Sequence, residues 1–171
     1  LFTGVAGGLA DAVGVGDVVV ATELLQHDMD ASPLFPRYEV PLTGRARFAT
    51  DPQWTKRLAD AAQAVLAAAS PPHRVSGRAA PRVHRGLVVS GDRFVATAVE
   101  SAALRAALPA ALAVEMEGAA AAQVCADFDR PCAVLRSISD RADDSAGADF
   151  GRFVAQVAAG LTRDIVRHAL A

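Results

Sequence analysis

The sequence predicts an α/β fold, a three-layer sandwich with a central, mixed and mostly parallel β-sheet. Two observations lead to this prediction. In the second half of the chain, short apolar runs alternate with segments whose apolar residues recur at helical spacing, and short links join them. The chain has 171 residues, of which 52% are hydrophobic and 21% charged, as expected for one globular domain with its own core.

The first 50 residues predict strands at their start and a long irregular segment after them. Residues 1–8 (LFTGVAGG) are typical of the end of a buried strand that runs into a glycine turn, and the apolar, β-branched residues 18–21 predict a second buried strand. Residues 27–47 hold three prolines and show little periodicity, so we expect an extended or irregular excursion there. A natural domain rarely opens in the middle of a strand, and Leu1 is not a methionine. We therefore expect a single domain over 1–171 that is incomplete at its N-terminus.

The remaining helices and strands are predicted in alternation, separated by short segments that contain turn-forming or polar residues. Asp51 and Pro52 predict a helix start, and an apolar stripe at helical spacing continues to Leu66, before the Ser-Pro-Pro at 70–72. A polar loop is expected over 72–81. Strands are then predicted at 85–89, 112–114 and 132–137, helices at 97–108 and 118–128, and a final helix whose apolar face runs from Phe150 to Ile165.

Composition and charge exclude several classes of function. A net charge of −2 without any basic run disfavours nucleic acid and membrane surfaces as partners, and every long apolar stretch is interrupted well before membrane-spanning length. Cys125 and Cys132 lie in apolar surroundings without metal-ligand spacing, which favours buried thiols in a reducing cytoplasm. We expect neither a metal nor another cofactor.

Residues that follow the predicted strands are the candidates for chemistry, because ligands of such sheets bind at the carboxyl ends of the strands. Taken singly, each candidate also has a structural explanation: a tight strand exit, a solvated carboxylate at a helix start or the cap of a loop. Four places are candidates: residues 4–8, Ser-Gly-Asp-Arg-Phe at 90–94, Glu-Met-Glu at 115–117 and Arg-Ser-Ile-Ser-Asp at 136–140.

The order and spacing of these motifs are more specific than any one of them. Phe94 and Glu117 are 23 positions apart, as are Glu117 and Asp140. In this arrangement, together with Thr-Gly-Val-Ala-Gly-Gly at 3–8 and Gln-His-Asp-Met-Asp at 26–30, the chain resembles the bacterial 5'-methylthioadenosine/S-adenosylhomocysteine nucleosidases of the nucleoside phosphorylase superfamily. The resemblance extends over nearly the whole chain and implies a nucleoside phosphorylase-like fold and hydrolysis of an N-glycosidic bond.

The resemblance also implies roles for particular residues. Asp140 matches the acid that protonates the departing adenine, and Glu117 matches the carboxylate that holds the ribose hydroxyls. Phe94 is expected to stack on adenine, the backbone of Val95 to bind its edge, and Met116 to pack against sugar and base. Further substrate-site positions implied by the resemblance are Glu115, Arg136, Ser139, Val5, Ala6 and Gly7.

Two departures from the family pattern are visible. The family's general base for the attacking water is a glutamate near the N-terminus, upstream of Leu1, so we expect residues 1–171 alone to be an incomplete catalyst. Val5 stands where the family usually has Ser or Thr, which puts one hydrogen bond and the substrate preference in question.

The loop with Leu34 and Phe35 matches a segment that lines the 5'-substituent pocket of a neighbouring subunit, so a homodimer is implied. His27, Asp28 and Asp30 just before it are interpreted as structural or interfacial.

Three alternatives remain open at this point. A phosphorylase of the same superfamily would require basic residues near the ribose, and only Arg93 and Arg136 stand next to a motif. A hydrolase of another purine nucleoside, such as futalosine, would share the fold. A non-catalytic nucleoside-binding protein would share it too, although the joint presence of Phe94, Glu117 and Asp140 disfavours that interpretation.

Overall fold

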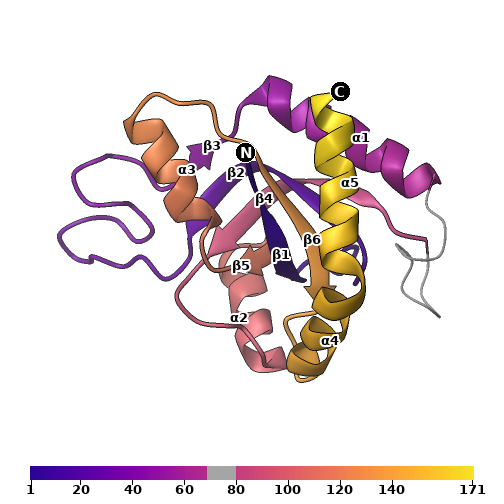
Figure 1. The fold of residues 1–171 in the computed structure, drawn as a ribbon. Helices are drawn as coiled ribbons and strands as arrows, with labels where there is room; N and C mark the ends of the chain where they lie inside the picture. The colour runs from indigo at the N-terminus through magenta and orange to yellow at the C-terminus, as the bar shows by residue number, and fades with distance from the viewer. Residues whose placement is uncertain (69–79) are drawn as a thin grey trace.

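The computed structural model describes residues 1–68 and 80–171 and contains a mixed β-sheet covered by helices (Figure 1). The strands of the described residues follow the order β3-β2-β4-β5-β1-β6, and β2 also pairs with β6, so the sheet curls back on itself. The longer ladders, β2 with β4 and β1 with β6, are parallel. The strands are β1 (Phe2–Gly8), β2 (Val18–Gln26), β3 (Phe48–Ala49), β4 (Val83–Ser90), β5 (Ala111–Glu115) and β6 (Val134–Asp140).

Helices pack on the outside of this curled sheet. Helix α1 (Pro52–Ala68) lies beside α5 (Ala159–Leu170), and the two share a core with β2 and β6 (Figure 1). Helix α4 (Ala146–Phe153) continues through a π-helical turn (Val154–Ala158) into α5. Helix α3 (Gly118–Asp127) packs against β2 and β4, and α2 (Ala98–Ala107) precedes β5. The α/β class with a mixed sheet is therefore confirmed.

The predicted helices are found close to their expected bounds. Asp51 accepts a hydrogen bond from the backbone N–H of Trp54 (2.8 Å) and so caps α1, and Thr97 caps α2 by accepting from the N–H of Glu100 (3.2 Å). The final helix buries Phe153 and Ile165 as expected, but Phe150 is 36% exposed. The predicted polar loop over 72–81 lies outside the described residues except for Ala80 and Pro81.

The glycine-rich segment at 4–8 is the main correction, because it is a strand and not a turn. The glycines let β1 approach its neighbours closely: a Cβ on Gly4 would lie 3.0 Å from the Arg136 guanidinium, and one on Gly8 would lie 3.1 Å from the Val13 carbonyl. The chain turns only after Leu9. Strand β2 also extends beyond the predicted residue 21, and the two-residue strand β3, which pairs with it, was not predicted.

The sheet topology brings the carboxyl ends of four strands together. Gly7 of β1 pairs with Val114 of β5 and with Asp140 of β6, and Ser90 of β4 pairs with Glu115 of β5. The residues that follow these strands therefore meet at one edge of the sheet. Among the described helices, none is long and apolar enough to cross a membrane.

Candidate active site

A small depression lies at these converging strand ends. Its lining comes from each of the four places that the sequence analysis singled out, so residues more than 130 positions apart in the chain face one space. It is lined by Gly7, Arg93, Phe94, Val95, Val114, Glu115, Met116 and Asp140.

Asp140 places a buried carboxyl group at this depression. Its residue is only 1% exposed, and its two oxygens have separate partners: the backbone N–H of Ala142 donates to Oδ1 (2.8 Å) and the Ser139 hydroxyl to Oδ2 (2.7 Å). Burial raises the pKa of Asp140 above its ordinary value, although both hydrogen bonds act in the opposite direction. Gly7 permits this arrangement, because a Cβ there would lie 2.8 Å from Oδ1. The site therefore contains a carboxyl group that is protonated more readily than that of a solvent-exposed aspartate.

Phe94 and Met116 provide exposed apolar surface beside this carboxyl group. Phe94 is 45% exposed and Met116 40%, and both line the depression, so they form an exposed apolar patch beside the carboxyl group. The ring of Phe150, from α4, contacts Phe94 edge-on with a centroid distance of 5.9 Å. The helical spacing of Phe150 predicts a position on the buried face of the last helix, but the residue is partly exposed and contacts Phe94 instead. Spacing along the helix carries no information about this contact. Val95 is buried beneath this surface.

Glu115 and Arg136 form a buried ion pair under the depression. Their side chains are 2% and 1% exposed, and both Nε (3.0 Å) and Nη2 of Arg136 donate to Oε2 of Glu115. The guanidinium also lies over the ring of Phe2, 4.5 Å from its centroid. Each charge is compensated within the protein, so the pair supports the site: Glu115 lines the depression, while Arg136 lies behind it and is absent from its lining.

Glu117 stands at the N-cap position of α3 with an exposed side chain that makes no capping hydrogen bond. It directly follows Met116 of the depression. Its backbone N–H donates to Oε2 of Glu115 at 3.3 Å. Glu117 is absent from the lining of the depression, although it follows Met116 in the chain, and its side chain is open to solvent.

Other predicted site residues lie apart from this depression. Val5 packs against the core formed by α1 and α5, and Ala6 is buried inside the sheet. Ser139 reaches the site only through its bond to Asp140. Leu34 is 83% exposed and Phe35 half-buried on the loop that projects beside α3 (Figure 1).

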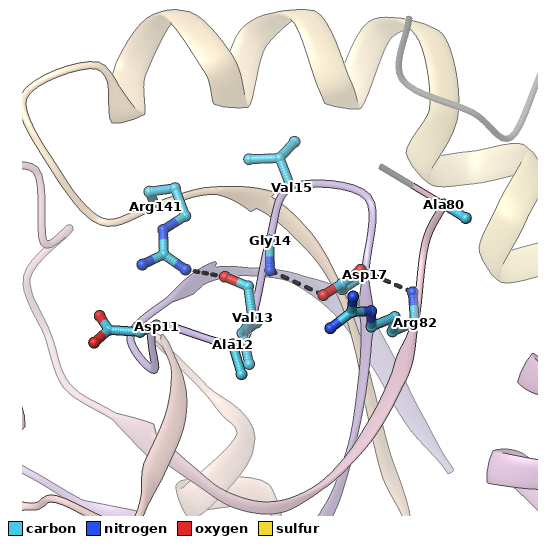
Figure 2. Close-up of a pocket in the computed structure, with 9 residues that line it drawn as sticks. All are labelled: Asp11, Ala12, Val13, Gly14, Val15, Asp17, Ala80, Arg82 and Arg141. Carbon is cyan, nitrogen blue, oxygen red and sulfur yellow. Dashed lines mark hydrogen bonds between the residues drawn. The ribbon is translucent and has the colours of Figure 1, made fainter. Parts of the chain in front are cut away.

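A second depression, of about 390 Å³, lies at the loop between β1 and β2 (Figure 2). Asp17, the buried carboxylate of its lining, is already engaged: it accepts from the N–H of Gly14 (2.9 Å) and of Arg82 (2.8 Å) and pairs with His84 (2.8 Å), as Figure 2 shows in part. Arg141 donates to the carbonyl of Val13. This cluster ties the loop to the start of β4.

In the described part of the chain, no group of three His, Cys, Asp or Glu side chains is arranged to hold a metal ion.

The curled mixed sheet, with a buried carboxyl group and exposed aromatic surface at its converging strand ends, defines a protein of the phosphorylase superfamily, whose family model matches residues 1–171. Within this superfamily, the chain belongs to the family of 5'-methylthioadenosine/S-adenosylhomocysteine nucleosidases. The nucleosidase of Mycobacterium bovis is 35% identical over 98% of this chain and 68% of its own length. That of Actinobacillus succinogenes is 37% identical over 89% of this chain and 60% of its own.

Solved structures show the same relationship. The Neisseria meningitidis nucleosidase, crystallised with methylthio-immucillin-A, has a TM-score of 0.83 and 37% identity, and the match covers 98% of this chain and 67% of that one. The futalosine hydrolase of Helicobacter pylori has a TM-score of 0.77 and 34% identity, with 97% and 66% covered. The chain thus spans about two thirds of the length of these proteins.

Proposed function

We propose that this protein hydrolyses the N-glycosidic bond of 5'-methylthioadenosine, S-adenosylhomocysteine or related 5'-substituted adenosines, releasing adenine and the thioribose. One observation carries the proposal: Asp140, a buried carboxyl group with a raised pKa, faces the same depression as the exposed Phe94 and Met116. A purine needs an apolar slot with an aromatic face, and a leaving purine needs a proton. Both are supplied here within a chain of the nucleosidase family.

Asp140 is assigned the role of general acid. As the bond to the ribose breaks, negative charge develops on adenine, and a protonated carboxyl group can neutralise it. Positioned acids contribute roughly 10²- to 10⁴-fold to the rate, or about 3 to 5 kcal/mol. The Ser139 hydroxyl and the Ala142 N–H hold the carboxyl group in place, and burial supplies the bias toward its protonated form.

Glu117 is assigned to the ribose. A carboxylate can accept hydrogen bonds from both ribose hydroxyls, and its negative charge stabilises the oxocarbenium-like cation that forms as the bond breaks. The exposed, uncapped side chain of Glu117 is available for this role. We assign Phe94, Val95 and Met116 to adenine and the sugar, while Glu115 and Arg136 support the site from below.

The reaction class is tested by measuring adenine release from 5'-methylthioadenosine with and without inorganic phosphate. A nucleosidase releases adenine and free thioribose at a rate that does not depend on phosphate. Strict phosphate dependence, with a ribose 1-phosphate product, would instead establish a phosphorylase. Stabilisation by adenine without any turnover would favour a non-catalytic binding protein.

A second candidate, hydrolysis of futalosine, is favoured by the structural match to the Helicobacter pylori futalosine hydrolase. The same buried acid and aromatic surface would serve a different purine nucleoside. Comparing kcat/KM for futalosine and 5'-methylthioadenosine separates the two candidates. We expect the thio-nucleoside to be preferred, and a higher kcat/KM for futalosine would reverse the assignment.

We further propose a homodimer in which the loop at 34–38 contacts the partner subunit. Leu34 is 83% exposed and Leu42 91%, so the loop carries apolar side chains that its own chain leaves uncovered, although Tyr38 packs against the core beside β4 and β5. Replacing Phe35 and Tyr38 with aspartate is therefore expected to weaken dimerisation at least tenfold and to reduce activity on bulky 5'-substituents.

Sedimentation over a range of concentrations measures this effect. Val99→Asp is a matched control, because Val99 is 79% exposed on α2, outside the loop. A wild-type protein that stays monomeric at high concentration would refute the dimer.

A cytoplasmic location and a part in methionine salvage complete the proposal. The two free cysteines, Cys125 and Cys132, agree with a reducing compartment. The proposed substrates carry a 5'-thio group, and their cleavage returns adenine and a thioribose for reuse.

A further inference from the structure

The N-terminal turn of α3 is capped from outside the helix. The first N–H groups of a helix have no partner within it, and the side chain at the N-cap position usually accepts one of these hydrogen bonds. Glu117 occupies this position without doing so. Instead, the Glu115 carboxylate accepts from the N–H of Gly118 (2.9 and 3.0 Å) and of Glu117 (3.3 Å). The N–H of Ala119 donates to the Ser90 hydroxyl at 2.8 Å.

Ser90 joins the two parts of this arrangement. Its hydroxyl donates to Oε1 of Glu115 while accepting from Ala119, so it uses both capacities of a hydroxyl group at once. The residue is 3% exposed and ends β4, where it pairs with Glu115 on β5. It is absent from the lining of the depression. Ser90 therefore connects two strand ends with the start of the helix that follows Glu117.

External capping has a consequence for Glu117. If Ser90 and Glu115 did not satisfy the helix N-terminus, the unpaired N–H groups and the positive end of the helix dipole would attract the carboxylate of Glu117, which occupies the N-cap position without a capping hydrogen bond. With these groups already paired, the Glu117 side chain is left in solvent at the edge of the site.

We propose that Ser90 is a positioning residue for Glu117: by pairing with Glu115 and Ala119 it keeps the Glu117 carboxylate free and directed to the ribose hydroxyls. This inference rests on the proposed function. Ser90 contacts no substrate and acts through the backbone of the 115–119 turn. Misplacing a catalytic group by about 1 Å can lower the rate by roughly 10²-fold, so the loss of one hydroxyl can have a large effect.

A double-mutant cycle in the full chain tests this mechanism. Ser90→Ala is expected to lower kcat/KM for 5'-methylthioadenosine by roughly 10²-fold. On a Glu117→Ala background, the same change is expected to cost less than about 3-fold, because the group that Ser90 positions is gone. The 2',3'-dideoxy substrate, which lacks the hydroxyls, should likewise be almost insensitive to Ser90→Ala.

Matched variants separate positioning from loss of structure. Ser101→Ala removes another buried hydroxyl, one without a hydrogen-bond partner among the described residues, and should leave kcat/KM and the cycle unchanged. Ser90→Cys keeps the shape with a weaker donor and should give an intermediate loss on the wild-type background only. If Ser90→Ala or Ser90→Cys costs the same factor with and without Glu117, the positioning role is wrong while the nucleosidase assignment stands. If the wild type, tested together with the residues that precede Leu1, releases no adenine, the proposed function itself fails.

Discussion

Asp140→Asn is expected to lower adenine release from 5'-methylthioadenosine by roughly 10²- to 10⁴-fold, the contribution of a positioned general acid. Asparagine fills the same space between Ser139 and Ala142 and can still form a hydrogen bond to adenine, but it has no acidic proton to deliver. The defect should therefore appear in kcat with little change in binding of a substrate analogue. Steady-state kinetics and calorimetric binding measure the two effects separately.

The pH dependence provides an independent readout of the same group. Burial raises the pKa of Asp140, and the protonated carboxyl group is the form that can donate. In the wild type, Asp140 is protonated at low pH, so this group does not limit turnover there. Turnover is expected to fall as the pH rises through the raised pKa of Asp140 and the carboxyl group loses its proton. That part of the profile should disappear in Asp140→Asn.

Two controls make this prediction specific. A nucleoside whose base leaves without protonation should lose far less activity in Asp140→Asn. Asp144→Asn removes an exposed carboxylate four positions away and should leave turnover within about 2-fold of wild type, as is usual for surface changes. Normal cleavage of 5'-methylthioadenosine by Asp140→Asn would assign the acid to another residue.

The sequence was most informative where periodicity and caps agree. The helix at 52–68 begins at Asp51-Pro52 because the aspartate caps it and proline fits its first position. The helix predicted at 97–108 is also present, but Thr97 is its cap and not its first residue. The strands that meet at the site were also found, because each apolar run is followed by conspicuous polar residues, but β6 runs from Val134 to Asp140 and not over the predicted 132–137, so the polar residues at 136–140 belong to the strand itself. Their convergence follows from parallel pairing, which brings carboxyl ends to one edge.

Other features depend on contacts between distant residues and leave no local signal. The glycines at 4–8 suggested a turn, yet they are needed where β1 passes the Arg136 guanidinium and the Asp140 carboxyl group. Ser90 was visible only as part of a motif, since its role depends on β4 pairing with β5. The π-helical turn and the contact between Phe150 and Phe94 could not be read from a pattern of apolar residues.

Glu115→Gln is expected to destabilise the protein by about 3 to 5 kcal/mol, the cost of leaving a buried charge without its partner. Both side chains of the Glu115–Arg136 pair are almost fully buried. Once Glu115 is neutral, water therefore cannot solvate the positive charge that remains on Arg136. The Arg136 guanidinium would retain a neutral amide, the Leu135 carbonyl at 3.5 Å and the face of Phe2. None of these compensates a full positive charge.

Arg136→Met should cost less than Glu115→Gln, although it breaks the same pair. The remaining Glu115 carboxylate keeps three sources of hydrogen bonds: the N–H groups of Gly118 and Glu117 and the hydroxyl of Ser90. Urea unfolding of each variant measures the difference in the free energy of unfolding. Lys56→Met is the control, because it breaks the ion pair between Lys56 and Asp60, whose side chains are 70% and 58% exposed. This change should alter the free energy of unfolding by less than about 1 kcal/mol. A Glu115→Gln variant within about 1 kcal/mol of wild type, or one more stable than Arg136→Met, would mean that the charge is compensated in some other way and that the pair is not the support of the site.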